Sequence, residues 1–247
     1  GPLPTFNPTS SQDLDSLLAR FRKQMFTEPH LLERQRLLTQ KKKNHHFLEE
    51  DPIYFPIGNQ TVQLTPKLVH HNFPRKMFTK AVHLMKVPSD FDAIPELVLG
   101  YTQSGSKLLD KNICMAVRRA GITGRADVLI KILEQAEHNK IHIPMSIARE
   151  GFRGFIVTAK LPSKHAVIKA VRGARQLRNL LGKQDTLGLD PEPVKIAKDP
   201  VGLGTLAGIT SEASRKFNGG LDHGGYTAWY VKKMFLPESW DSVKDEQ

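Results

Sequence analysis

The sequence is poor in cysteine, in acidic residues and in long apolar runs. Its 247 residues include one cysteine, Cys114, so no internal disulfide can form. No run of 18 apolar residues occurs, so we predict no membrane-spanning helix. Asp and Glu total 25 against 36 Lys and Arg, which gives a formal net charge of +11. Such an excess favours an anionic partner, most often nucleic acid or a membrane surface.

Motifs of known catalytic sites are also missing. The chain has no HEXXH, GxSxG or phosphate-loop motif. Cys114 falls within a predicted helix without an obvious base nearby. The pairs His45–His46 and His70–His71 have no accompanying cysteine cluster, and adjacent residues do not easily share a helix face, so we predict no metal site. We therefore expect a non-enzymatic protein without a cofactor or a small-molecule substrate.

Helical periodicity is strongest in the stretch from residue 110 to residue 183. Apolar residues recur at helical spacing from Ile113 to Ala120, and again from Leu129 to Leu133. Gly121 and Gly124 lie between these segments, as the end of a helix and a tight turn require. The pattern predicts two amphipathic helices joined as an antiparallel hairpin.

Similar helical pairs are predicted on either side of this hairpin. Ala81, Ala116 and Gly151 take equivalent places in three first helices, each 35 residues apart, and Ala93 and Ala126 match in second helices at a spacing of 33. A unit of this length predicts stacked hairpins that cover one another's apolar faces. We therefore expect an all-α fold with about three helical hairpins over residues 74–183.

One of these hairpins carries a family signature in residues 116–144. It has a small residue and a glycine at the turn, Ala120–Gly121, then Ala126 early in the second helix and Ile143–Pro144 at its end. This stretch resembles a pentatricopeptide repeat, which implies an α-solenoid that binds RNA. The other two units depart from the pattern, since Pro95 interrupts one second helix and the third unit lacks the glycine turn, so the array is degenerate. A generic array of helical hairpins is the alternative.

The segment before the repeats, residues 1–73, is a basic extension. Amphipathic helices are predicted after Ser10 and Ser11 and again from Pro29. The positive charges of the second helix and the residues after it are poorly balanced by acids, which favours contact with RNA phosphates over a merely solvated surface. The residues proposed for this contact are Arg34, Arg36, Lys41, Lys42 and Lys43.

Residues 51–74 change character, with four prolines and a short alternating piece from Thr61 to Leu64. This composition predicts either an extended connector or a small β-hairpin, ordered by a partner. Tyr54 and Phe55 could stack on bases or dock into a protein groove, and we favour docking.

The last predicted helix of the array, which ends near Lys183, carries the most suggestive basic row. Arg172, Arg175 and Arg178 step by three residues and share roughly one side, and no acid interrupts them. Arginine contacts phosphate bidentately, so the row fits a line of phosphates better than a solvated face. Nearby lysines proposed for the same role are Lys164, Lys169 and Lys183.

The remaining residues, 184–247, form a Gly/Pro-rich and aromatic extension. Gly202, Gly204 and Gly208 come close to a dinucleotide-binding spacing but miss it by one residue, so we expect a flexible loop here and a short helix after Thr210. The aromatic residues predicted to dock a partner are Trp229, Tyr230 and Trp240.

These features give two functional hypotheses. Degenerate pentatricopeptide proteins that resemble this chain occur in mitochondrial ribosomes, which implies a structural constituent that binds rRNA and other ribosomal proteins in the mitochondrial matrix. Within that resemblance we favour the large subunit and a fungal source. The alternative is a free pentatricopeptide-type RNA-binding factor in organellar transcript processing or translational activation, but about three irregular repeats are few for reading bases. A start at Gly1 without Met fits removal of an import segment and equally a trimmed or engineered start.

Overall fold

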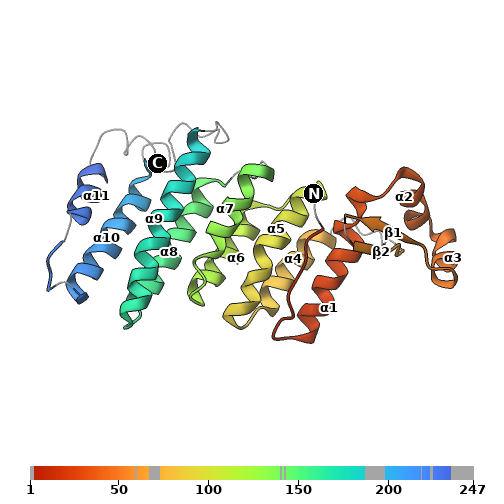
Figure 1. Cartoon of the computed structure of the whole chain (residues 1–247), viewed down its shortest axis with the longest axis horizontal. Helices are drawn as coiled ribbons and strands as arrows, with labels where there is room; N and C mark the ends of the chain where they lie inside the picture. Colours follow the sequence, from red (N-terminus) through yellow and green to blue (C-terminus); the bar gives the residue numbers. More distant parts are fainter. Residues whose placement is uncertain are drawn as a thin grey trace. The chain divides into compact units, whose positions relative to one another are not determined.

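The computed structural model describes residues 3–58, 60–66, 73–139, 141, 143–186, 198–217, 219–222 and 225–234. This part of the chain is mostly helical, which confirms the predicted all-α fold (Figure 1). Its contacts divide the chain into two compact units, Gly1–Leu108 and Leu109–Gln247. The contacts therefore group the chain differently from the predicted segments 1–73, 74–183 and 184–247. The first repeat helices pack with the N-terminal segment, and the described helix at 200–217 packs on the later repeats.

The first unit contains both helices and a small sheet. Its elements are α1 (Gln12–Phe21), a π-helical turn (Arg22–Phe26), α2 (Glu33–Gln40), α3 (His45–Glu50), β1 (Tyr54–Ile57), β2 (Gln60–Gln63), α4 (Phe73–Leu84) and α5 (Ala93–Gln103). Short 3-10 turns at Glu28–His30, Lys42–Asn44 and Pro88–Asp92 connect them.

An aromatic cluster forms the core of this unit. Phe21 stacks on Phe26 with ring centroids 5.9 Å apart, and Tyr101 meets both rings edge-on. Phe78 of α4 meets Tyr101 from another side, at 5.6 Å. Gly100 allows the approach, since a Cβ there would lie 2.5 Å from the Phe26 ring. The cluster thus joins the N-terminal helix to the first predicted repeat helices.

In the described part of the segment between α3 and α4, β1 and β2 form the small hairpin, which is one of the two predicted alternatives. β1 and β2 are antiparallel, with Phe55 opposite Val62 and Ile57 opposite Gln60. Phe55 and Ile57 are buried and their neighbours in β1 are exposed, so the strand alternates as a half-buried sheet requires.

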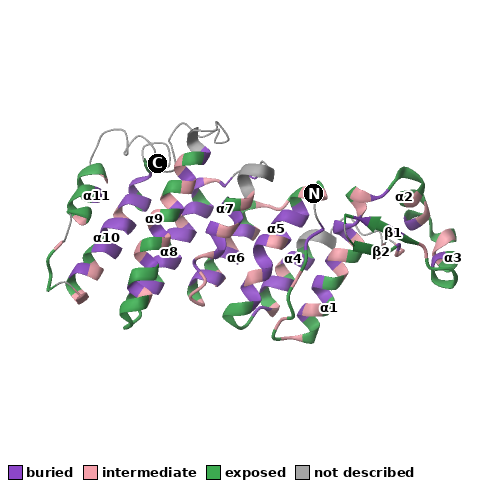
Figure 2. Ribbon diagram, in the orientation of Figure 1, coloured by how far each residue is buried: buried purple, intermediate pink, exposed green. Residues whose placement is uncertain are grey.

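The second unit continues the helical pairs. Its helices are α6 (Asp110–Ile122), α7 (Val128–Asn139), α8 (Met145–Lys160), α9 (Lys164–Thr186), α10 (Pro200–Phe217) and α11 (Tyr226–Met234). α6 ends in a tight turn in which Gly124 has a φ of 81° and the N–H of Arg125 donates to the carbonyl of Ala120 at 2.8 Å. The predicted apolar stripes of α6 and α7 are buried, as Figure 2 shows in purple.

Helices α6 and α8 approach closely where two glycines meet. A Cβ on Gly121 would lie 2.8 Å from the Cα of Gly154, and a Cβ on Gly154 would lie 3.0 Å from the Cα of Gly121. Two backbones therefore touch here with no side chain between them. This contact explains the glycine at the end of α6 as a packing requirement as well as a turn signal.

The expectation of a flexible loop around Gly202, Gly204 and Gly208 is wrong, because these glycines lie inside α10. Pro200 takes the first helical position, and the Asp199 carboxylate accepts a hydrogen bond from the N–H of Gly202 at 3.0 Å. A Cβ on Gly202 would lie 2.9 Å from the Phe152 ring of α8, so this glycine permits close helix packing. The helix also begins ten residues before the one expected after Thr210, and nine of its 18 residues are buried.

Candidate nucleic-acid interface

Helix α9 carries the predicted basic row, and its opposite face packs against neighbouring helices. Its apolar stripe, Val167, Ala170, Ala174, Leu177 and Leu181, is fully buried against neighbouring helices of the same unit. Lys164, Lys169, Arg172 and Lys183 are exposed, whereas Arg175 and Arg178 are half-buried. The helical period therefore separates the packing face of α9 from its charged face.

Two arginines of this row are covered on one side by aromatic rings of α11. The guanidinium carbon of Arg175 lies 4.0 Å from the ring centroid of Tyr226, and that of Arg178 lies 5.3 Å from the ring centroid of Trp229. Lys233 of α11 lies over the same Trp229 ring, at 5.8 Å. Both distances are typical of cation–π contacts. These contacts hold the two guanidinium groups against the faces of the aromatic rings.

Other arginines of this unit are paired with carboxylates. Arg118 makes two hydrogen bonds to Glu150, at 2.7 and 3.0 Å, and Arg153 adds a third at 2.8 Å. The hydrogen bond from Arg118 is the main cause of the low pKa of Glu150, whose side chain is 7% exposed. Further pairs join Arg125 to Asp127, Arg149 to Asp199 and Arg215 to Glu212.

Among the described residues, the arginines of α9, Arg172, Arg175 and Arg178, have no such carboxylate partners. The Nε atoms of Arg175 and Arg178 are buried without a hydrogen-bond acceptor in the same part of the chain. A buried charged donor without an acceptor is costly. Because these Nε atoms are shielded, an outside anion would be bound by the outer ends of the two guanidinium groups.

The lysines of the row are less uniform. Burial raises the pKa of Asp127, but the hydrogen bond and charge of Arg125, with a smaller effect of Lys169, lower it below its ordinary value. Lys169 is thus partly balanced by this carboxylate. Lys164 lies 5.9 Å from the ring centroid of Phe217 in α10. The three arginines are therefore the part of the row least neutralised by the chain itself.

The second predicted basic cluster lies in the other compact unit. Arg34 and Arg36 of α2 are exposed, and so are the three lysines that follow this helix, Lys41, Lys42 and Lys43. Apolar side chains of the same segment are exposed beside them in the sequence, with Leu32 71% exposed and Phe47 52% exposed. The two predicted basic clusters, the row on α9 and the group from Arg34 to Lys43, thus lie in different units.

The predicted docking aromatics divide into exposed and buried residues. Tyr54 is 61% exposed and Trp229 is 43% exposed, so both are available to a partner. Phe55 and Tyr230 are each 5% exposed and pack within their own units, because each points inward from its element. Trp240 lies outside the described residues.

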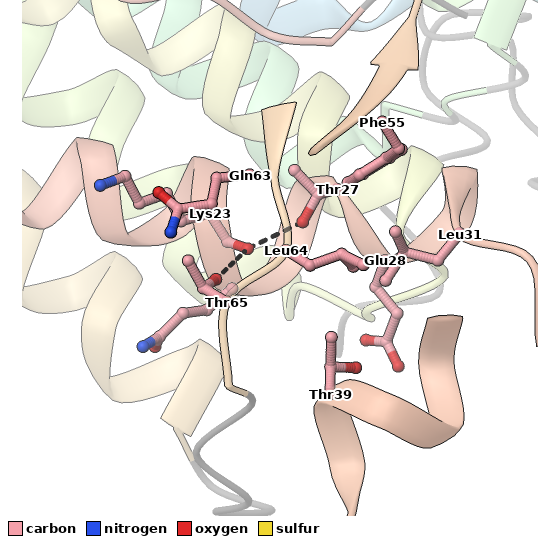
Figure 3. Close-up of a pocket in the computed structure, with 10 residues that line it drawn as sticks. Lys23, Thr27, Glu28, Leu31, Thr39, Phe55, Gln63, Leu64 and Thr65 are labelled. Atoms are coloured by element: carbon pink, nitrogen blue, oxygen red, sulfur yellow. Dashed lines mark hydrogen bonds between the residues drawn. The ribbon is translucent and has the colours of Figure 1, made fainter. Parts of the chain in front are cut away.

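A small cavity lies between the first helices and the β-hairpin of the first unit (Figure 3). Its volume is about 10 Å³, enough for one water molecule. The hydroxyls of Thr27 and Thr65 both donate to the carbonyl of Lys23, at 2.8 and 3.4 Å, so these polar groups bond to the chain itself.

Comparison with protein families supports the first of the two functional hypotheses. The family model of mitochondrial ribosomal protein mS27 matches residues 1–245. The chain belongs to the mitochondrial ribosomal protein mS27 family. A search of curated proteins finds no match. Membership in the mS27 family makes the chain a structural constituent of the mitochondrial ribosome and places it in the mitochondrion, as the first hypothesis predicted.

The same comparison corrects one expectation. Proteins of the mS27 family belong to the small ribosomal subunit, so the preference for the large subunit has no support. That preference rested only on resemblance between degenerate helical repeats, which share periodicity for packing reasons and do not encode the subunit. The mS27 family is also one of ribosomal proteins, a class that is typically non-enzymatic. Among the described residues, no helix is both long and apolar enough to cross a membrane.

Proposed function

We propose that this chain is a protein of the small mitochondrial ribosomal subunit that binds the rRNA backbone through Arg172, Arg175 and Arg178. The observation that carries the proposal is that no carboxylate among the described residues pairs with them. In the same unit, ion pairs are formed by Arg118, Arg125, Arg149, Arg153 and Arg215. Because the three residues step along one helix, their charges form a line, as the phosphates of an RNA strand do.

The choice of arginine supports phosphate contact in particular. A guanidinium group presents a planar fork of donors that matches two phosphate oxygens, while lysine offers a single point charge. Phosphate contacts position a protein on RNA without reading its sequence. The proposal therefore requires no base recognition and assigns none.

The test replaces all three arginines with glutamine in the full chain and measures RNA affinity across a salt series. If each arginine neutralises one phosphate, the slope of log affinity against log salt should fall by about 2–3 units. Affinity for unrelated RNA sequences should fall by similar factors, since phosphates are common to all of them.

A matched control removes three positive charges from other helices of the same unit. Lys111, Lys131 and Lys160 lie on α6, α7 and α8, and their replacement by glutamine changes the net charge equally. The control should change the slope by less than about one unit. An equal effect of the two triple variants would show that net charge alone governs binding and would refute the assignment to α9.

The subunit assignment has its own experiment. In a sucrose gradient at high salt, the chain should sediment with the small mitochondrial subunit and be absent from fractions that hold only the large subunit. Sedimentation with the large subunit would refute the small-subunit assignment. Free sedimentation would favour the alternative, a soluble pentatricopeptide-type factor.

We also infer secondary contacts through the first unit. The exposed charges of Arg34, Arg36 and Lys41 to Lys43 suit rRNA, and the exposed Tyr54 suits a neighbouring ribosomal protein. The pentatricopeptide likeness of the α6–α7 hairpin is part of the same proposal. It is supported by Ala120 and Gly121 at the end of α6 and by Ala126 just before α7.

A further inference from the structure

Helix α11 supplies aromatic rings to the arginine row, although its sequence suggested a role in docking proteins. Tyr226 and Trp229 are one turn apart and cover Arg175 and Arg178, which are likewise one turn apart on α9. Both rings remain partly exposed, Tyr226 at 48% and Trp229 at 43%. The same kind of contact therefore occurs twice, because the two rings and the two arginines are each spaced three residues apart.

We infer that α11 forms part of the RNA-binding surface, with Tyr226 and Trp229 as positioning residues for the two arginines. This inference rests on the proposed function, because it names the residues that orient the same arginine row. The ligand is the phosphodiester backbone of RNA, and the contribution of α11 is to fix the direction of the guanidinium forks.

The geometry of stacking explains how this works. A ring that covers the face of a guanidinium group leaves the edge of that group, where its N–H donors lie, free for oxygen acceptors. The Nε atoms of Arg175 and Arg178 are buried and unbonded within the described part of the chain, while the two residues as a whole are only half-buried. An outside anion would therefore be bound by the Nη atoms. A fork held in this way loses less conformational entropy on binding phosphate than a freely rotating one.

The charge of α11 argues against the opposite role, a cover that competes with RNA. A segment that mimics RNA would bring carboxylates to the arginines. Between Tyr226 and Met234 the helix has no acidic residue, and its exposed Lys232 and Lys233 carry the same sign as the row. Helix α11 therefore adds positive charge to the surface and neutralises none of it.

Specific contacts hold α11 in this place. The carboxylate of Asp222 accepts hydrogen bonds from the N–H groups of Thr227 and Ala228, at 2.9 and 3.2 Å, which caps the start of the helix. Thr227 also donates from its hydroxyl to that of Thr210 in α10, at 3.1 Å. The position of the rings thus depends on α10, the glycine-containing helix that packs on both α8 and α9.

The experiment compares two double variants of the full chain that have the charge of the wild type. Tyr226→Leu with Trp229→Leu removes both rings, while Tyr226→Phe with Trp229→Phe retains an aromatic face at each position. Binding of a fluorescently labelled RNA is measured by anisotropy, and circular dichroism checks that the helices are retained. The leucine pair should weaken binding about 5-fold or more, and the phenylalanine pair should restore most of the loss.

The possible outcomes separate this inference from the proposed function. If the arginine triple variant weakens binding and the leucine pair does not, the row binds RNA without help from α11 and the inference is overturned. Tighter binding by the leucine pair would instead identify α11 as a cover, which also overturns it. If neither variant changes affinity, the α9 surface does not bind RNA and the proposed function fails as well. An equal loss in the leucine and phenylalanine pairs would overturn a role for the ring faces.

Discussion

Replacing Gly121 with alanine should destabilise the second unit, although alanine is the better helix former. The new Cβ would lie 2.8 Å from the Cα of Gly154, well inside ordinary van der Waals contact. Because the obstacle is backbone, no side-chain rotation relieves it, and α6 and α8 must separate by about half an ångström. Overpacking of this kind typically costs about 1–3 kcal/mol in the free energy of unfolding.

The gain from helix propensity only partly offsets this cost. Alanine in place of glycine stabilises a helix interior by up to about 1 kcal/mol, and less near a helix end such as this one. The net change should be a loss of roughly 1–2 kcal/mol, which lowers the thermal midpoint of the second unit by roughly 3–8 °C. Differential scanning calorimetry measures this midpoint and can resolve two units that unfold separately.

Gly208 provides the matched control for this prediction. It is also helical, but a Cβ there would meet no atom within 4 Å. Gly208→Ala should therefore stabilise α10 by about 0.5–1 kcal/mol through propensity alone. If both variants raised the midpoint, the reasoning about α6 and α8 would be refuted, because the two backbones could not then be in contact at Gly121.

Two further predictions concern the core of each unit. Leu133→Ala should lower the free energy of unfolding of the second unit by roughly 2–5 kcal/mol, since Leu133 is 5% exposed, and an unchanged calorimetric midpoint would refute its burial. Asp90→Asn should destabilise the first unit by about 1–3 kcal/mol, because the Asp90 carboxylate accepts hydrogen bonds from Ser10, Lys86 and Val87. Burial alone would raise the pKa of Asp90, but these hydrogen bonds have the larger combined effect. The pKa of Asp90 therefore lies below its ordinary value. The stabilisation should therefore be complete above about pH 4 and disappear as the pH falls through the lowered pKa, so urea titrations of wild type and variant should converge in acid.

The sequence predicted the helices whose apolar residues recur at helical spacing. The stripes of α6, α7 and α9 are identifiable in the sequence because apolar residues recur at every helical turn. The glycine at position 124 marks the turn. Helix α10 contradicts the prediction because its glycines are typical of a loop. The correct signals were present, with Asp199 and Pro200 at the start and Leu203, Leu206, Ala207 and Thr210 at helical spacing. The glycine at position 202 is explained only by the Phe152 ring of another helix, which sequence order does not reveal.

The candidate site was predictable only in part for a similar reason. The arginine row follows from spacing along one helix, so Arg172, Arg175 and Arg178 could be found in the sequence. Their stacking on Tyr226 and Trp229 depends on the position of α11, about 50 residues further along the chain. Without that placement, the aromatic residues of a Gly/Pro-rich extension indicate docking groups for a partner, and their contact with the arginines cannot be deduced.

The arginines of α9 differ from Arg118 and Arg153 of the same unit in that no described carboxylate forms an ion pair with them. Arg118 and Arg153 share Glu150, and that arrangement contributes to the fold whether or not RNA is present. In contrast, like charges kept together without carboxylates repel one another and reduce the stability of the isolated unit. A ligand that binds only the folded state restores that stability in proportion to its affinity. We therefore expect the second unit to be less stable in the free chain than when rRNA is bound, because the phosphates of rRNA neutralise the row. This suits a protein whose working state is an assembled ribosome.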